Sequence, residues 1–91
     1  MAEITVTPTG SHAFNVTIDD GGGQTTHDVT VPAALADELG VGPDDQARLV
    51  EASFAFLLER EPATSILARF ELDVIERYFP GYVEEMRHRL A

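Results

Sequence analysis

The carboxylates are the side chains of this sequence with the clearest potential for chemistry. Asp19 and Asp20 precede a run of three glycines, and Asp28 follows a few residues later. Clustered carboxylate oxygens are ligands that a hard cation such as calcium prefers. A calcium-binding loop, however, places Asp or Asn at alternate positions, and this segment lacks that spacing. We therefore expect a solvated turn here rather than a metal site.

His27 is the second candidate for chemistry. On strand periodicity it shares a side with Val29 and Val31, which places the imidazole at the edge of an apolar core. Neither His12 nor His88 stands at a ligand spacing from it. We expect a hydrogen-bonded histidine at the edge of the core rather than a metal ligand.

No motif for catalysis is present. The sequence contains no nucleophile elbow, phosphate-binding loop, dinucleotide fingerprint or His-Glu-x-x-His. Ser11, Ser53 and Ser65 have no base beside them in a recognisable pattern. All six basic residues are arginines and cysteine is absent, so Schiff-base lysines and thiolate nucleophiles are excluded. The prediction is a protein that is not an enzyme and needs no cofactor.

Arginines could still clamp an anion. Arg60, Arg69 and Arg77 lie in one stretch of the chain, but each has acidic residues close by in sequence. Exposed ion pairs of this kind contribute little to stability and are common on protein surfaces. We expect these arginines to form surface ion pairs.

The charge balance narrows the classes of partner. Sixteen acidic residues against six basic ones give a formal charge of −10, and residues 1–47 contain no Lys or Arg. Such a field repels nucleic acid and anionic membranes. It could serve a basic protein partner, or it could serve only solubility or salt adaptation. The sequence therefore predicts no nucleic acid and no membrane as partners.

The absence of cysteine fits a reducing cytoplasm, which is the expected location. The longest nearly apolar run, Ala52 to Leu58, is far shorter than the roughly 20 residues that span a bilayer. At 91 residues the chain has the length of one domain.

Apolar residues alternate with polar ones over the first third of the chain. Three such segments, 3–7, 14–18 and 24–31, are separated by turn residues. They predict a three-stranded antiparallel meander over residues 3–31 with one apolar face, which helices must cover. The expected fold class is α+β, with a helical part over residues 32–90 of a single domain, 1–91.

From Pro32 onward the apolar spacing changes to that of helices. The expected helical segments are 32–39, 43–60, 63–70, 73–79 and 82–90. The segment 43–60 is unusual because its apolar arc covers about 200°, roughly twice that of a surface helix. A break is expected at residues 70–72, followed by a capping box between Asp73 and Glu76.

The segment Val29 to Asp45 combines a strand, the dipeptide Val31-Pro32, a short helix and the turn Leu39-Gly40. In this it resembles AbrB-like antitoxin and transition-regulator domains with a swapped hairpin. The resemblance implies a basic DNA-binding face and a further strand at residues 48–52. The periodicity of this chain predicts a helix at those residues instead.

A second resemblance covers Glu59 to Tyr82. This run, which contains Glu59-Arg-Glu-Pro and Arg77-Tyr-Phe-Pro-Gly, is similar to a group of small bacterial proteins described only as hypothetical. That resemblance implies no activity.

The wide apolar arc predicts a central helix that is covered on two sides, either by the rest of the chain alone or in part by a second copy. We predict a homodimer through segments 43–60 and 82–90. The expected interface residues are Leu49, Phe54, Phe56, Leu57, Tyr82, Met86 and Leu90.

Two functional hypotheses follow. One is a small acidic cytoplasmic interaction or regulatory protein that acts through protein–protein contacts without catalysis. The other is an antitoxin-like regulator that binds a basic toxin or another basic partner.

Overall fold

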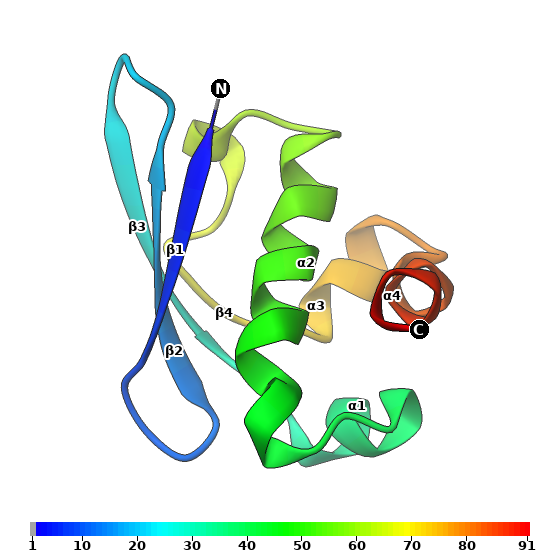
Figure 1. The fold of residues 1–91 in the computed structure, drawn as a ribbon. Coiled ribbons are helices and arrows are strands. Elements are labelled where there is room, and N and C mark those ends of the chain that lie inside the picture. Colours follow the sequence, from blue (N-terminus) through cyan, green and yellow to red (C-terminus); the bar gives the residue numbers. More distant parts are fainter. Residues whose placement is uncertain (1) are drawn as a thin grey trace.

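A four-stranded sheet with helices on one face forms the frame of the computed structural model, which describes residues 2–91 (Figure 1). The strands lie in the order β1-β2-β3-β4. Their bounds are Glu3–Pro8 for β1, Ala13–Asp19 for β2, Gln24–Thr30 for β3 and Arg69–Glu71 for β4. The α+β class predicted from the sequence is confirmed.

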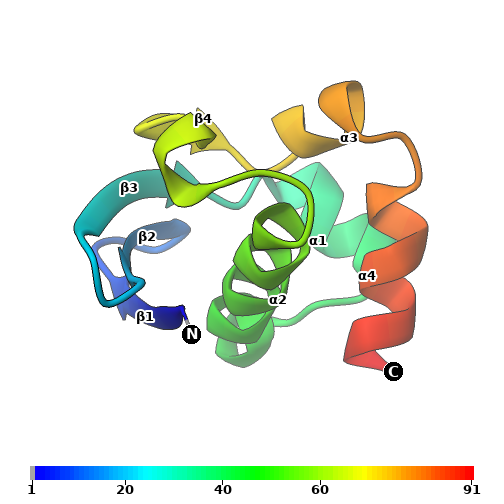
Figure 2. The same cartoon turned by 90° about the horizontal axis from the view of Figure 1, so that it is seen from above.

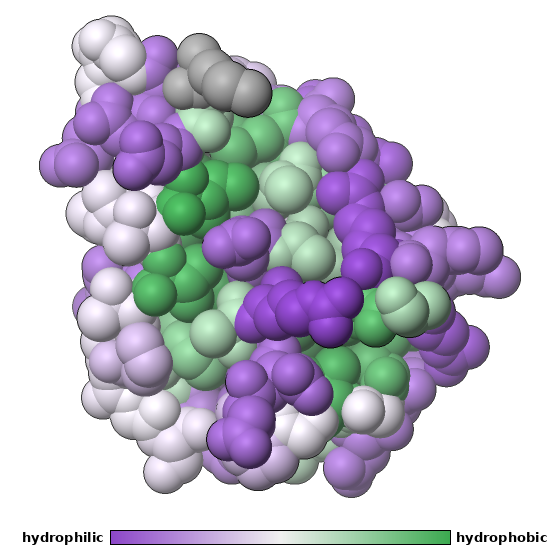
Figure 3. All heavy atoms as spheres, in the orientation of Figure 1, coloured by the Kyte–Doolittle hydropathy of each residue, from purple (hydrophilic) through white to green (hydrophobic). Residues whose placement is uncertain are grey.

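The first three strands form the expected antiparallel meander, with Phe14 opposite Val29 and Val16 opposite His27. Strict alternation places Phe14, Val16 and Ile18 of β2 and His27 and Val29 of β3 on the buried face, whereas Thr26, Asp28 and Thr30 of β3 face solvent. On β1, Ile4 and Val6 are half-buried where the strand lies beside α2 (Gln46–Leu58). Figure 3 shows apolar surface along this seam between β1 and α2.

The fourth strand corrects the prediction of a helix over residues 63–70. Ala63–Ser65 forms a single 3₁₀ turn, and the chain then runs extended into β4, parallel to β3. The Asp28 N–H donates to the Ala68 carbonyl at 2.8 Å, and the Leu72 N–H donates to the Thr30 carbonyl at 3.0 Å. Pairing with the free edge of β3 therefore outweighs the helical spacing of the apolar residues in this segment.

The helix α2 follows the 3₁₀ turn Pro43–Asp45 and lies between the sheet and α4 (Tyr82–Leu90), as Figure 2 shows from above. Its Phe54 ring lies 5.4 Å from the His27 ring, on the sheet side. Its Phe56 ring lies 5.5 Å from the Tyr82 ring, on the α4 side. A helix covered on two sides needs the wide apolar arc that the sequence shows. Because residues 46–58 are helical, the strand implied at 48–52 by the AbrB-like resemblance does not form.

The remaining helices are α1 (Ala33–Leu39) and α3 (Val74–Tyr78). The predicted stop at Gly40 is confirmed, since this residue adopts the left-handed conformation with φ of 67° and closes α1. The expected capping box at Asp73 does not form. The Glu76 carboxylate instead accepts the N–H of Gly81 at 3.3 Å and of Val83 at 2.9 Å. Glu76 thus caps the start of α4 from the preceding helix.

A buried polar contact joins α2 to α4. The Ser53 hydroxyl donates to the Leu49 carbonyl at 2.7 Å, and the Tyr82 hydroxyl donates to the Ser53 oxygen at 2.6 Å. Both side chains are completely buried. Burial raises the pKa of Tyr82 well above its usual value, so the phenol stays protonated and keeps donating.

Removing one member of this contact should cost more than removing both. In Ser53→Ala the buried Tyr82 hydroxyl loses its acceptor, and the free energy of unfolding should fall by about 1–3 kcal/mol. Adding Tyr82→Phe removes the stranded hydroxyl and should restore part of that loss. Urea unfolding of the two single variants and the double variant measures the coupling. Strictly additive losses would contradict the contact.

An ion-pair network connects the C-terminal end of α4 to the C-terminal end of α2. Arg89 donates through Nε to Glu85 at 2.9 Å and through a terminal nitrogen to both oxygens of Glu59 at 2.8 and 2.9 Å. The hydrogen bond from Arg89 holds the pKa of Glu85 below its usual value. A carboxylate with a lowered folded-state pKa stabilises the fold above its ordinary pKa, and this contribution is lost as pH falls through the lowered value.

The pKa of Glu85 should therefore return toward its ordinary value in Arg89→Gln. A pH titration of the side-chain carboxyl by NMR measures this shift. Arg87→Gln changes the net charge equally on the same helix, without a hydrogen bond to Glu85, and serves as the control. An equal shift in both variants would indicate a general charge effect rather than the bond from Arg89.

Candidate functional site

The structure buries the residues that the sequence assigned to a dimer interface. Six of the seven are buried within one chain, with exposed fractions of 0–3%, and only Leu90 is half-buried. The buried six are Leu49, Phe54, Phe56, Leu57, Tyr82 and Met86. This burial corrects the expected assignment, because it places them in the core of a single chain rather than on a surface between two chains.

The contacts of Phe56 show how one chain buries the side of α2 that faces away from the sheet. Its ring has edge-on contacts with Phe79 at 6.1 Å and Tyr82 at 5.5 Å. The guanidinium carbon of Arg60 lies 3.6 Å from the centre of the same ring, a cation–π contact. The side of α2 that carries Phe56 is thus covered by Tyr82 of α4, by Phe79 just after α3 and by Arg60 just after α2.

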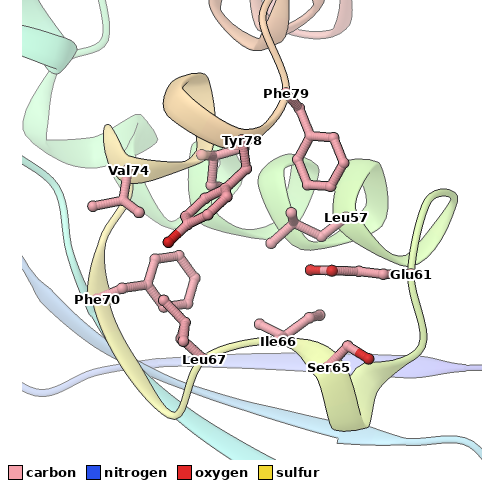
Figure 4. Close-up of a pocket in the computed structure, with 10 residues that line it drawn as sticks. Leu57, Glu61, Ser65, Ile66, Leu67, Phe70, Val74, Tyr78 and Phe79 are labelled. Carbon is pink, nitrogen blue, oxygen red and sulfur yellow. The ribbon is translucent and has the colours of Figure 1, made fainter.

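An apolar cleft opens elsewhere, where the end of α2, the segment leading into β4 and α3 meet (Figure 4). Its volume is about 330 Å³, within the size range of small-ligand sites. The lining is largely apolar, with one carboxylate, one aliphatic hydroxyl and one phenol. It consists of Leu57, Glu61, Ser65, Ile66, Leu67, Phe70, Val74, Ile75, Tyr78 and Phe79.

His27 holds one wall of this cleft in place. Its Nδ1 donates to the Leu67 carbonyl at 2.8 Å, and its Nε2 lies 2.9 Å from the Thr25 hydroxyl. A carbonyl only accepts, so Nδ1 carries a proton, and in the neutral ring Nε2 accepts from Thr25. The Phe54 ring packs between the rings of His27 and Phe70, at 5.4 and 5.9 Å. The expected hydrogen-bonded histidine at the core edge is confirmed.

Two large side chains beside the cleft remain in water. Leu67 is 51% exposed and Tyr78 is 67% exposed, whereas large hydrophobic side chains are more often buried. Figure 4 shows the Tyr78 side chain pointing toward Phe70 and Leu67 on one side of the cleft, with Glu61 and Phe79 on the other. Exposed aromatic and apolar side chains next to an apolar hollow are typical of a binding surface.

Glu61 is the charged group of the cleft. It is half-buried, and none of the ion pairs found in residues 2–91 involves it. A partly desolvated carboxylate without a cation favours a ligand that carries positive charge. No feature of the sequence pointed to Glu61, because it acts with residues that only the fold brings to it.

The carboxylates at the turn between β2 and β3 accept hydrogen bonds from the backbone of the turn itself. Asp19 accepts the N–H of Gly21 at 2.9 Å, and Asp20 accepts the N–H groups of Gly22 and Gly23 at 3.0 Å each. Within residues 2–91 no group of three His, Cys, Asp or Glu side chains is placed to hold a metal ion.

The arginines are used in part as expected. Arg60 pairs with Glu59 at 3.4 Å, and Arg69 lies 4.0 Å from Asp28 on the exposed face of the sheet. Asp28 also accepts a hydrogen bond from Asn15. These pairs are largely solvated and contribute little to stability.

Comparison of the chain with protein-family models, curated proteins and solved structures finds no match. No helix in the described part of the chain has the length and hydropathy needed to cross a membrane.

Phe56→Asp should unfold the chain rather than release a folded monomer. Truncating a buried phenylalanine already costs about 3–5 kcal/mol, and the buried carboxylate adds a desolvation cost. Circular dichroism and urea unfolding should show the loss of the cooperative transition. Arg48→Asp, which adds Asp on the exposed side of the same helix, is the control and should stay folded. A folded Phe56→Asp variant at half the wild-type mass would instead place Phe56 in an interface.

Proposed function

We propose that this protein is a small, non-catalytic interaction protein, and that its cleft binds a segment of a partner protein carrying an apolar side chain next to a basic one. The observation that carries the proposal is the exposure of Leu67 and Tyr78 beside an apolar hollow. Their exposure costs stability that covering them would restore, so a partner that covers both gains binding energy.

The chemistry of the lining supports binding over catalysis. The cleft offers one carboxylate, from Glu61, and one aliphatic hydroxyl, from Ser65, among apolar side chains. His27, which contacts the Leu67 backbone behind the cleft, is only 3% exposed. Its Nδ1 bonds to the Leu67 carbonyl and its Nε2 to the Thr25 hydroxyl. The lining therefore lacks the paired nucleophile and base that acyl-transfer chemistry needs.

The charge of the molecule supports a basic partner. At a formal charge of −10 the chain attracts positively charged proteins over a distance, and this attraction raises the rate of association. Glu61 provides a local carboxylate inside the cleft that can pair with Lys or Arg of the bound segment. A basic toxin of the kind proposed for antitoxin-like regulators is one such partner.

Peptide selection tests this function. A random dodecapeptide library displayed on phage is selected on the wild type, and the enriched peptides are measured against Leu67→Asp and Tyr78→Asp. Both positions are exposed, so the free energy of unfolding should change by only about 0.5 kcal/mol. Affinity should fall about tenfold or more, as for the central residues of an interface.

Two controls separate the cleft from general charge. Thr26→Asp adds the same carboxylate at an exposed position of β3 and should leave affinity within about twofold. Glu61→Gln should weaken peptides that contain Lys or Arg more than peptides without them. Enriched peptides that bind the cleft variants as well as the wild type, or a selection that enriches none, would reject the proposal.

A further inference from the structure

We infer that two copies of this chain join through the open edge of β4, in antiparallel pairing about a two-fold axis at Phe70. The interface lies beside the cleft but does not include the core residues of α2 and α4. This dimer does not depend on the partner proposed above, since the molecular mass of the isolated protein tests it without any partner.

The free edge of β4 follows from its pairing with β3. Ala68 accepts from Asp28 and Leu72 donates to Thr30, so the backbone groups of alternate residues 68, 70 and 72 face β3. The N–H and carbonyl groups of Arg69 and Glu71 consequently point away from β3. β4 is the outermost strand of the sheet, and no loop in residues 2–91 hydrogen-bonds to the backbone of these two residues.

A second copy matches this edge in both hydrogen bonds and charge. In antiparallel pairing centred on Phe70, Arg69 lies directly opposite Glu71 of the other copy, and each residue donates and accepts one backbone bond. The side chains of both residues are on the exposed face of the sheet, where opposite charges on facing strands attract. The residues with free backbone groups are thus the ones that carry complementary charges.

The edge of β1 offers no such match. Pro8 at its end has no N–H to donate, and Glu3 is its sole charged residue. Antiparallel pairing of two β1 strands therefore brings no opposite charges together in any register. The self-complementary pattern therefore belongs to β4.

The pairing also brings the exposed side chains beside β4 in the two copies to the same face of the joined sheet. A two-fold axis perpendicular to the sheet keeps the helices of both copies on the same face. Phe70 lines the cleft from β4, and Leu67 lies just before it, as Figure 4 shows for one copy. In the paired sheet the clefts of the two copies therefore meet across the axis. The joined sheet forms the floor of one longer apolar trough, with Leu67 and Tyr78 from each copy beside it.

Charge reversal with a compensating swap tests the pairing. Light scattering across micromolar to millimolar concentration should give twice the chain mass for the wild type. Arg69→Glu and Glu71→Arg each place like charges opposite one another, and the dimer dissociation constant should rise about tenfold. The double variant restores opposite charges and the wild-type net charge, so its dissociation constant should return to the wild-type value.

A proline variant tests the backbone bonds separately. Glu71→Pro removes an N–H that faces away from β3, so the fold should persist by circular dichroism while the dimer weakens at least tenfold. Glu71→Val keeps that N–H and serves as the control for the lost carboxylate. The outcomes that would overturn the inference are a wild type at single-chain mass up to millimolar concentration, a dimer unaffected by the proline, or a charge swap that fails to restore association. Cleft-dependent peptide binding by a monomer would leave the proposed function standing.

Discussion

The burial of α2 on two sides is the constraint on which the rest of this structure depends. Val50 and Phe54 face the sheet, whereas Ser53 and Phe56 face α4, and all four are buried. A three-stranded meander has one apolar face and can cover only half of such a helix. The C-terminal segment must therefore return across α2, and its capping by Glu76 and its contact through Tyr82 direct it there.

The return path of the chain also creates the cleft. Between α2 and α3 the chain pairs with the edge of β3 instead of forming a helix, and the hydrogen bond from His27 to the Leu67 carbonyl secures that extended path. Ile66 and Phe70 then turn inward, but Leu67 and Tyr78 remain in water. A histidine that resembles a catalytic or metal-binding residue in the sequence thus has a structural task, which is to position the wall of a binding surface.

The arrangement is suited to recognition. The molecule is strongly acidic, its cleft is apolar with one unpaired carboxylate, and the edge strand beside it has free backbone groups at two oppositely charged residues. These features meet on one side of the molecule, away from the seam between β1 and α2. A strand that pairs with β4 is held by backbone hydrogen bonds, whereas an apolar side chain in the cleft is held by burial. The two kinds of contact are compatible, so this side of the molecule can make both.

The sequence by itself determined the meander, the stop of α1 at Gly40, the two-sided burial of α2 and the buried position of His27. Each depends on local periodicity or on the conformational preference of a single residue. Only the tertiary structure decided that residues 69–71 form a strand, because that choice depends on the unpaired edge of β3, some forty residues earlier in the chain. The cleft follows from the same choice. Apolar spacing shows which residues avoid water, but it does not distinguish a cover within one chain from a cover by another, and so it placed core residues such as Phe56 and Met86 in an interface.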